Sequence, residues 1–112
     1  MADLLIDDDT VTVSLSGIEK VEALHGDVTV PRSAIVGARA VADGMAEVHG
    51  LRMPGTGFPG LIMVGTFRHP RGTTFAVCHG QQPAVVLDLS GANYDRIVAT
   101  VANPEDAVRS LS

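Results

Sequence analysis

The chain contains one cysteine, no tryptophan and few aromatic side chains. The single cysteine, Cys78, excludes an internal disulfide and a cysteine-based metal cluster. Because aromatic residues make up only 4% of the sequence, we expect a core of aliphatic side chains. No apolar stretch approaches the about 18 residues that a membrane-spanning helix needs. The first residues also lack the positive segment of a signal peptide, so we expect a cytoplasmic location.

Basic residues are also scarce. Eight Lys and Arg face 13 Asp and Glu, which gives a net charge of −5. Nucleic acid and anionic lipid are bound by clustered basic side chains, so we expect neither as a partner. The one basic cluster, formed by Arg68, His69 and Arg71, is too small to favour lipid binding. The length of 112 residues predicts a single domain, 1–112.

Short apolar segments separated by Gly, Pro and Asp predict about seven strands. Alternating or continuous apolar residues mark them, bounded by turn residues. The predicted strands cover residues 10–15, 28–31, 34–42, 61–68, 73–79, 84–89 and 95–101. Residues 4–6 form either a further strand or a packed tail. The short, regularly spaced turns after residue 68 predict consecutive hairpins in an antiparallel meander.

Three segments are predicted to be helical. Ser16 and Glu19 have the spacing of a capping box, which predicts a short helix between the first two of these strands. Residues 45–49 are expected to form a single helical turn. Asn103 and Pro104 are typical of a helix start, and Val108 and the residues around it give the C-terminal helix an apolar face. We expect this face to cover an open end of the sheets.

This order of elements resembles the bacterial pleckstrin-homology-like domains. The segments 30–35 and 103–106 are similar to ones common in those families, and segment 52–57 resembles one found in an uncharacterised bacterial subgroup. The resemblance implies a mainly β fold, a partly open barrel of about seven antiparallel strands capped by a C-terminal helix. It also implies a role as a binding or assembly module, and it transfers no catalytic motif.

Residues 50–60 form the most unusual segment, with four glycines and two prolines in eleven positions. This composition predicts a loop rather than a regular strand. The loop is either a rigid turn or a binding site in which Arg52 orients a carboxylate or phosphate and Phe58 provides an apolar anchor. The candidate binding residues are Arg52, Met53, Gly55, Thr56, Gly57 and Phe58.

Other candidate chemistry has a simpler explanation in each case. The four histidines do not have the spacing of a metal site, and we expect no metal and no cofactor. Cys78 and His79 are neighbours in a strand, so their side chains point to opposite faces and cannot act as nucleophile and base. We expect Cys78 to be a packed thiol. The acidic run 7–9 lacks the pattern of a calcium loop and is interpreted as a solvated turn.

Several strands after residue 60 are apolar on both faces. A small barrel buries one face only, so the second face must be covered by helices, by segment 50–60 or by another subunit. We therefore expect a non-catalytic module for protein–protein interaction or homo-oligomerisation. The alternative is a small-molecule or anion binder, or a minor enzyme, with a pocket where Arg52 and His49 converge. The sequence leaves both open.

Overall fold

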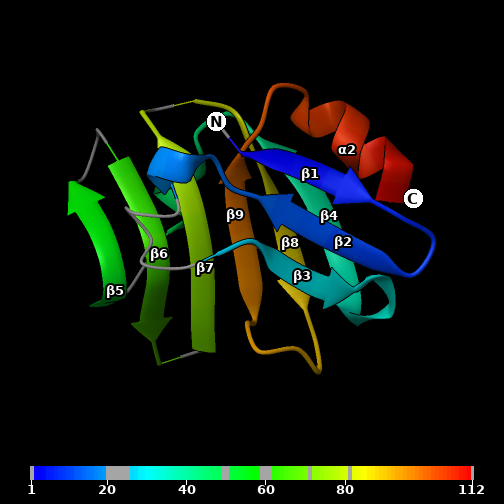
Figure 1. Cartoon of the computed structure of the whole chain (residues 1–112), viewed down its shortest axis with the longest axis horizontal. Helices are drawn as coiled ribbons and strands as arrows, with labels where there is room; N and C mark the ends of the chain where they lie inside the picture. The colour runs from blue at the N-terminus through cyan, green and yellow to red at the C-terminus, as the bar shows by residue number, and fades with distance from the viewer. Residues whose placement is uncertain are drawn as a thin grey trace.

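The computed structural model describes residues 2–19, 26–48, 51–58, 62–70, 72–80 and 82–111. These residues form a mainly β structure of two separate sheets with a helix near the C-terminus (Figure 1). Within them no helix is both long and apolar enough to pass through a membrane.

The small sheet contains the first three strands, in sequence order and antiparallel. These are β1 (Asp3–Ile6), β2 (Thr10–Ser14) and β3 (Val28–Pro31). Residues 4–6 therefore belong to a strand. The strict alternation of β2 places Val11 and Val13 on the buried face and its threonines on the other, as the pattern predicts.

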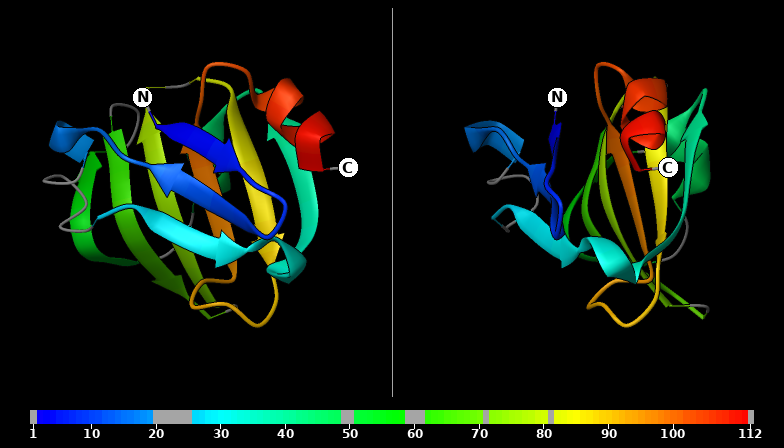
Figure 2. Two further views of the ribbon diagram at one scale, coloured as in Figure 1. Left: turned by 45° about the vertical axis from the view of Figure 1, so that its right-hand side comes forward. Right: turned by 90° about the vertical axis from the view of Figure 1, so that its right-hand side faces the viewer.

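The large sheet contains six strands in the order β4-β8-β9-β7-β6-β5. Their bounds are β4 (Ile35–Val41), β5 (Leu51–Phe58), β6 (Ile62–His69), β7 (Gly72–His79), β8 (Ala84–Leu89) and β9 (Arg96–Thr100). The small sheet lies across one face of this large sheet (Figure 2). We call that face the inner face and the opposite one the outer face.

The predicted meander is wrong in one respect: β9 lies between β7 and β8. It pairs antiparallel with β8 and parallel with β7. The 80–83 connection must therefore step across one strand, a distance of about 10 Å. Its length allows this, since an extended chain covers roughly 3.5 Å per residue. The apolar patterns of the three strands are too similar to specify which becomes the neighbour of β7.

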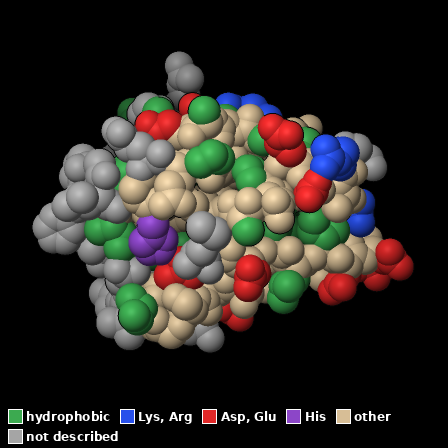
Figure 3. All heavy atoms as spheres, turned by 90° about the horizontal axis from the view of Figure 1, so that it is seen from above, with side chains coloured by type: hydrophobic (Ala, Val, Ile, Leu, Met, Phe, Trp, Pro, Cys, Tyr) green, Lys and Arg blue, Asp and Glu red, His purple; other side chains and the backbone are tan. Residues whose placement is uncertain are grey.

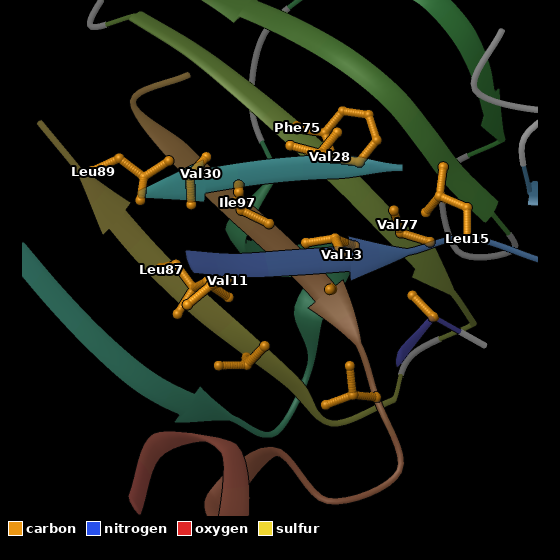
Figure 4. Packing of buried hydrophobic residues seen from close by; sticks show 14 of the residues in the cluster. Val11, Val13, Leu15, Val28, Val30, Phe75, Val77, Leu87, Leu89 and Ile97 are labelled. Carbon is orange, nitrogen blue, oxygen red and sulfur yellow. The ribbon is translucent and has the colours of Figure 1, made fainter. Parts of the chain in front are cut away.

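Aliphatic side chains from both sheets fill the space at the inner face. Val11, Val13 and Val28 of the small sheet meet Leu87 and Ile97 of the large sheet (Figure 4). Phe75 is the one large ring among the described residues that are fully buried in this core, and its ring centroid lies 5.4 Å from that of the partly buried Tyr94. The core is therefore aliphatic, as the composition predicts.

The outer face of the large sheet carries a second, smaller apolar cluster. It includes Ala76, Cys78, Val86 and Val98, all fully buried. The 3-10 helix η2 (Gly44–Glu47) and the residue after it cover this cluster with Met45 and Val48. The predicted helical turn at 45–49 is thus confirmed. The sequence allowed helices, segment 50–60 or another subunit to cover this second apolar face, and the structure shows the helix η2 of the same chain on it.

Segment 50–60 is not the predicted loop, because residues 51–58 form β5, at the edge of the large sheet. An edge strand needs hydrogen bonds on one side only, which makes proline tolerable there. The β5–β6 register also shifts between Arg52 and Gly55, the stretch that contains Pro54. A bulge of this kind accommodates a residue that cannot donate to the ladder.

Both predicted helix starts are confirmed. The Ser16 N–H donates to Glu19 Oε1 at 2.8 Å, and the Glu19 N–H donates to Ser16 Oγ at 3.2 Å, which is the reciprocal capping box. The helical turn covers residues 17–19, and residues 20–25 lie outside the described residues. Helix α2 (Pro104–Leu111) packs Val108 and Leu111 against the inner core, beside β1, β4 and β8.

Candidate functional site: a polar pocket on the outer face

The outer face of the large sheet changes character along its strands. Next to the apolar half that η2 covers lies a polar half with an open cavity of about 440 Å³. Five elements contribute to its walls, together with the turn after β6 and the residue before β9. We call this cavity the outer pocket; it is lined by Glu47, His69, Pro70, Thr74, Asp88, Asp95 and Arg96.

Strand register builds the floor of the outer pocket. Arg96 of β9 stands opposite Asp88 of β8 on one side and opposite Thr74 of β7 on the other. These three residues form a row across the sheet because β9 is inserted between β7 and β8. A meander with β7 beside β8 would not bring Arg96 between Thr74 and Asp88, so the site depends on the parallel pair.

Two ion pairs fix the charged walls. Arg96 Nε donates to Asp88 Oδ1 at 2.9 Å, with both side chains about one-third exposed. Arg39 Nη2 donates to Glu47 Oε1 at 2.6 Å, and this pair links β4 to η2. Partial exposure keeps the net stability gain of such pairs at or below about 1 kcal/mol. Their main effect here is to hold the carboxylates of Glu47 and Asp88 in place at the rim and floor.

His69 and Thr74 form the third wall. The Thr74 side chain is 1% exposed, and its Oγ1 lies 3.4 Å from His69 Nε2. His69 is the last residue of β6 and Thr74 lies in β7, so the β6–β7 hairpin brings them together. A hydroxyl and an imidazole are thereby added to the carboxylates and the guanidinium.

Asp95 ties the residue before β9 to the start of β7. Its Oδ2 accepts the Thr73 N–H at 2.7 Å, and its own N–H donates to the Thr73 carbonyl at 2.8 Å. At Gly72, with φ +140°, an added Cβ would lie only 2.0 Å from Asp95 Oδ2. Glycine is therefore required for Asp95 to close over the β6–β7 turn, and this contact sets the end of the outer pocket.

The lining of the outer pocket is known only for residues whose side chains the structure describes, and the candidate residues of segment 52–58 are not in that group. Arg52, Met53, Gly55, Thr56, Gly57 and Phe58 all lie in β5, where the structure describes the backbone alone. In the β5–β6 register, Arg52 stands opposite Phe67, and Phe67 precedes the pocket residue His69 by two positions in β6. His49 lies outside the described residues. The predicted convergence of Arg52 and His49 in one pocket is therefore left as a prediction.

Sequence reasoning missed Glu47, Asp88 and Arg96. A signal for Asp88 was present: it is the one charged residue in the apolar strand β8, and it shares a face with Val86. A charge on a face that is otherwise apolar marks the place where that face opens to solvent. Glu47 and Arg96 carry no such local signal, because their positions depend on η2 docking and on the insertion of β9.

Cys78 lies in the neighbouring apolar half of the outer face. It is fully buried, and burial raises the pKa of its thiol to about 12. The thiol therefore stays protonated at neutral pH, which agrees with the predicted packing role. In the part of the chain that the structure describes, no three His, Cys, Asp or Glu side chains are placed to hold a metal ion.

Comparison with family models, curated proteins and solved structures finds no match to this chain.

Proposed function

We propose that this chain is a non-catalytic binding module that takes a small polar ligand in the outer pocket. One observation carries the proposal: a cavity of about 440 Å³ stands over the middle of the large sheet, and side chains of both charges converge on it. Small-molecule sites have volumes of about 300–1,000 Å³ and a few well-placed polar groups. This corresponds to the small-ligand alternative from the sequence, moved from segment 50–60 to the outer face.

The rigidity of the floor supports this proposal. Thr74, Asp88 and Arg96 stand on three adjacent strands in the middle of a six-stranded sheet. Side chains on paired central strands are held more precisely than side chains on a loop. The site is thus preorganised, and a ligand binding there needs little ordering of the chain.

Self-association or a protein partner stays a prediction, as does the pleckstrin-homology-like assignment. The argument for association relied on an uncovered apolar face, and η2 covers the apolar half of that face. The exposed large hydrophobic residues among those described are Leu5, Ile18 and Val36, on separate elements. Seen from above, hydrophobic side chains also lie scattered among polar and acidic ones (Figure 3).

The test is a nuclear magnetic resonance screen of the ¹⁵N-labelled chain against mixtures of small polar metabolites. We expect saturable shifts of the amide signals of Thr74, Asp88 and Arg96. Arg96→Gln should weaken binding at least about tenfold, the loss of one charge-assisted hydrogen bond. Arg109→Gln is the matched control, since Arg109 makes a similar ion pair with Asp106 on α2.

A different outcome would overturn the proposal. If the mixtures shift amides only outside the outer pocket, or if Arg96→Gln and Arg109→Gln bind equally well, the pocket is not the binding site.

A further inference from the structure

The charges around the outer pocket specify the kind of ligand more closely than its volume does. Among the described residues, three carboxylates, those of Glu47, Asp88 and Asp95, line the cavity together with the guanidinium of Arg96. A ligand with negative charge alone would face three like charges, and such repulsion is an effective way to exclude wrong ligands. A ligand with positive charge alone would leave the terminal nitrogens of Arg96 without an anionic partner.

The internal ion pairs leave specific atoms for a ligand. Arg96 uses Nε for Asp88, and its two terminal nitrogens make no hydrogen bond with any described residue. Glu47 uses Oε1 for Arg39, and Asp88 uses Oδ1 for Arg96. Their second oxygens, Glu47 Oε2 and Asp88 Oδ2, have no hydrogen-bond partner among the described residues. The pocket therefore offers a paired donor and two acceptors that are already ionised.

From this arrangement we infer that the ligand of the outer pocket is a zwitterion, with a carboxylate held by Arg96 and an ammonium group held by Glu47 and Asp88. The inference rests on the proposed function. Two parallel N–H groups of a guanidinium match the two oxygens of a carboxylate. An ammonium group brings three donors and no acceptor, which suits the oxygens of Glu47 and Asp88.

The internal pairs also explain why the site is ready for such a ligand. Arg39 and Arg96 neutralise part of the acidic charge, so both carboxylates stay in place when no ligand is present. A zwitterion adds no net charge to this balance. Binding therefore completes hydrogen bonds that the protein leaves open, without breaking either ion pair.

The experiment uses a series of ω-amino acids of increasing length: glycine, β-alanine, 4-aminobutyrate and 6-aminohexanoate. Hexylammonium and hexanoate are the single-charge controls of matched chain length. Binding is measured from the amide shifts of Thr74, Asp88 and Arg96 in the full chain. We expect one member of the series to bind at least about tenfold more tightly than either single-charge compound, the gain of one additional charge-assisted contact.

Variants separate the two ends of the ligand. Glu47→Gln should weaken binding of the best ω-amino acid by about tenfold, because it removes charge at the ammonium end, and should not weaken binding of hexanoate, because it removes a repelling carboxylate. Glu105→Gln, which removes one acidic charge from α2, is the matched control and should change neither.

The inference fails if hexylammonium or hexanoate binds as tightly as every ω-amino acid, or if other metabolites shift the pocket amides and no zwitterion does. In both cases the pocket binds ligand and the proposed function stands. If no compound of any charge shifts the pocket amides, the proposed function fails together with the inference.

Discussion

Gly44 is the position at which one added methyl group tests how η2 covers the outer face. A Cβ at this residue would lie 2.6 Å from the Ala84 Cβ and 3.3 Å from the Cys78 Sγ. Carbon atoms do not approach to 2.6 Å without a shift, and Ala84 belongs to the central strand β8. Because the sheet cannot yield, Gly44→Ala should push η2 away from the apolar cluster.

The expected loss of stability in Gly44→Ala is that of an overpacked core, which lowers the free energy of unfolding by about 1–3 kcal/mol. For a domain of this length, 1 kcal/mol corresponds to a shift in Tm of about 4 °C. We therefore expect Gly44→Ala to lower Tm by about 4–12 °C. Since η2 shields Cys78, the rate of thiol labelling by a disulfide reagent should rise by about fivefold or more, the factor that corresponds to 1 kcal/mol of easier opening.

Calorimetry and thiol labelling of the same samples make the test. Gly17→Ala is the control, because a Cβ there meets nothing within 4 Å. The double variant Gly44→Ala with Ala84→Gly lacks the Ala84 methyl group that clashes with the new Cβ. Its decrease in Tm should therefore be smaller than the sum of the decreases in the two single variants. If Gly44→Ala has the Tm and the labelling rate of the unmodified chain, η2 does not pack on the sheet as described.

Three further predictions concern other contacts. Ser16→Ala removes the acceptor of the Glu19 N–H, so urea denaturation should show a loss of about 1 kcal/mol in the free energy of unfolding, and no loss would contradict the capping box. Arg32→Gln removes a hydrogen bond of 2.8 Å to the Ser110 carbonyl, so the free energy of opening the last turn of α2 should fall by about 0.5–1.5 kcal/mol. Amide exchange in that turn should become faster, and unchanged exchange would contradict this contact. For Cys78, the folded thiol keeps its proton up to a pKa of about 12 while the unfolded thiol ionises near 9.0. Stability should therefore fall as pH rises above about 9, by at most about 1.4 kcal/mol per pH unit, and Cys78→Ala should remove that part of the slope; an identical slope in the variant would contradict the burial of the thiol.

Local features of the fold were predictable because they depend on neighbours in the sequence. The alternation in β2 and the spacing of Ser16 and Glu19 each specify a structure within a few residues. Asn103 and Pro104 likewise indicate the start of α2 within one residue. In each case the interaction that decides the structure lies within one turn or one strand.

Features that depend on distant partners were not predictable in the same way. Proline and glycine in segment 50–60 favour a loop by local rules, but a place at the sheet edge makes a strand possible. The insertion of β9 beside β7 is decided by packing among strands with similar apolar patterns. Glu47, Asp88 and Arg96 come together only through that insertion and the docking of η2, so their convergence has no signal in the chain.

The pairing of β9 with β7 is therefore the feature on which the outer pocket most directly depends. Nuclear Overhauser contacts between the backbones of β7 and β9 test it. We predict contacts that follow the parallel register, Phe75 with Ile97 and Ala76 with Val98, together with antiparallel contacts of Val86 with Val98. Direct backbone contacts between β7 and β8, with none between β7 and β9, would contradict the account.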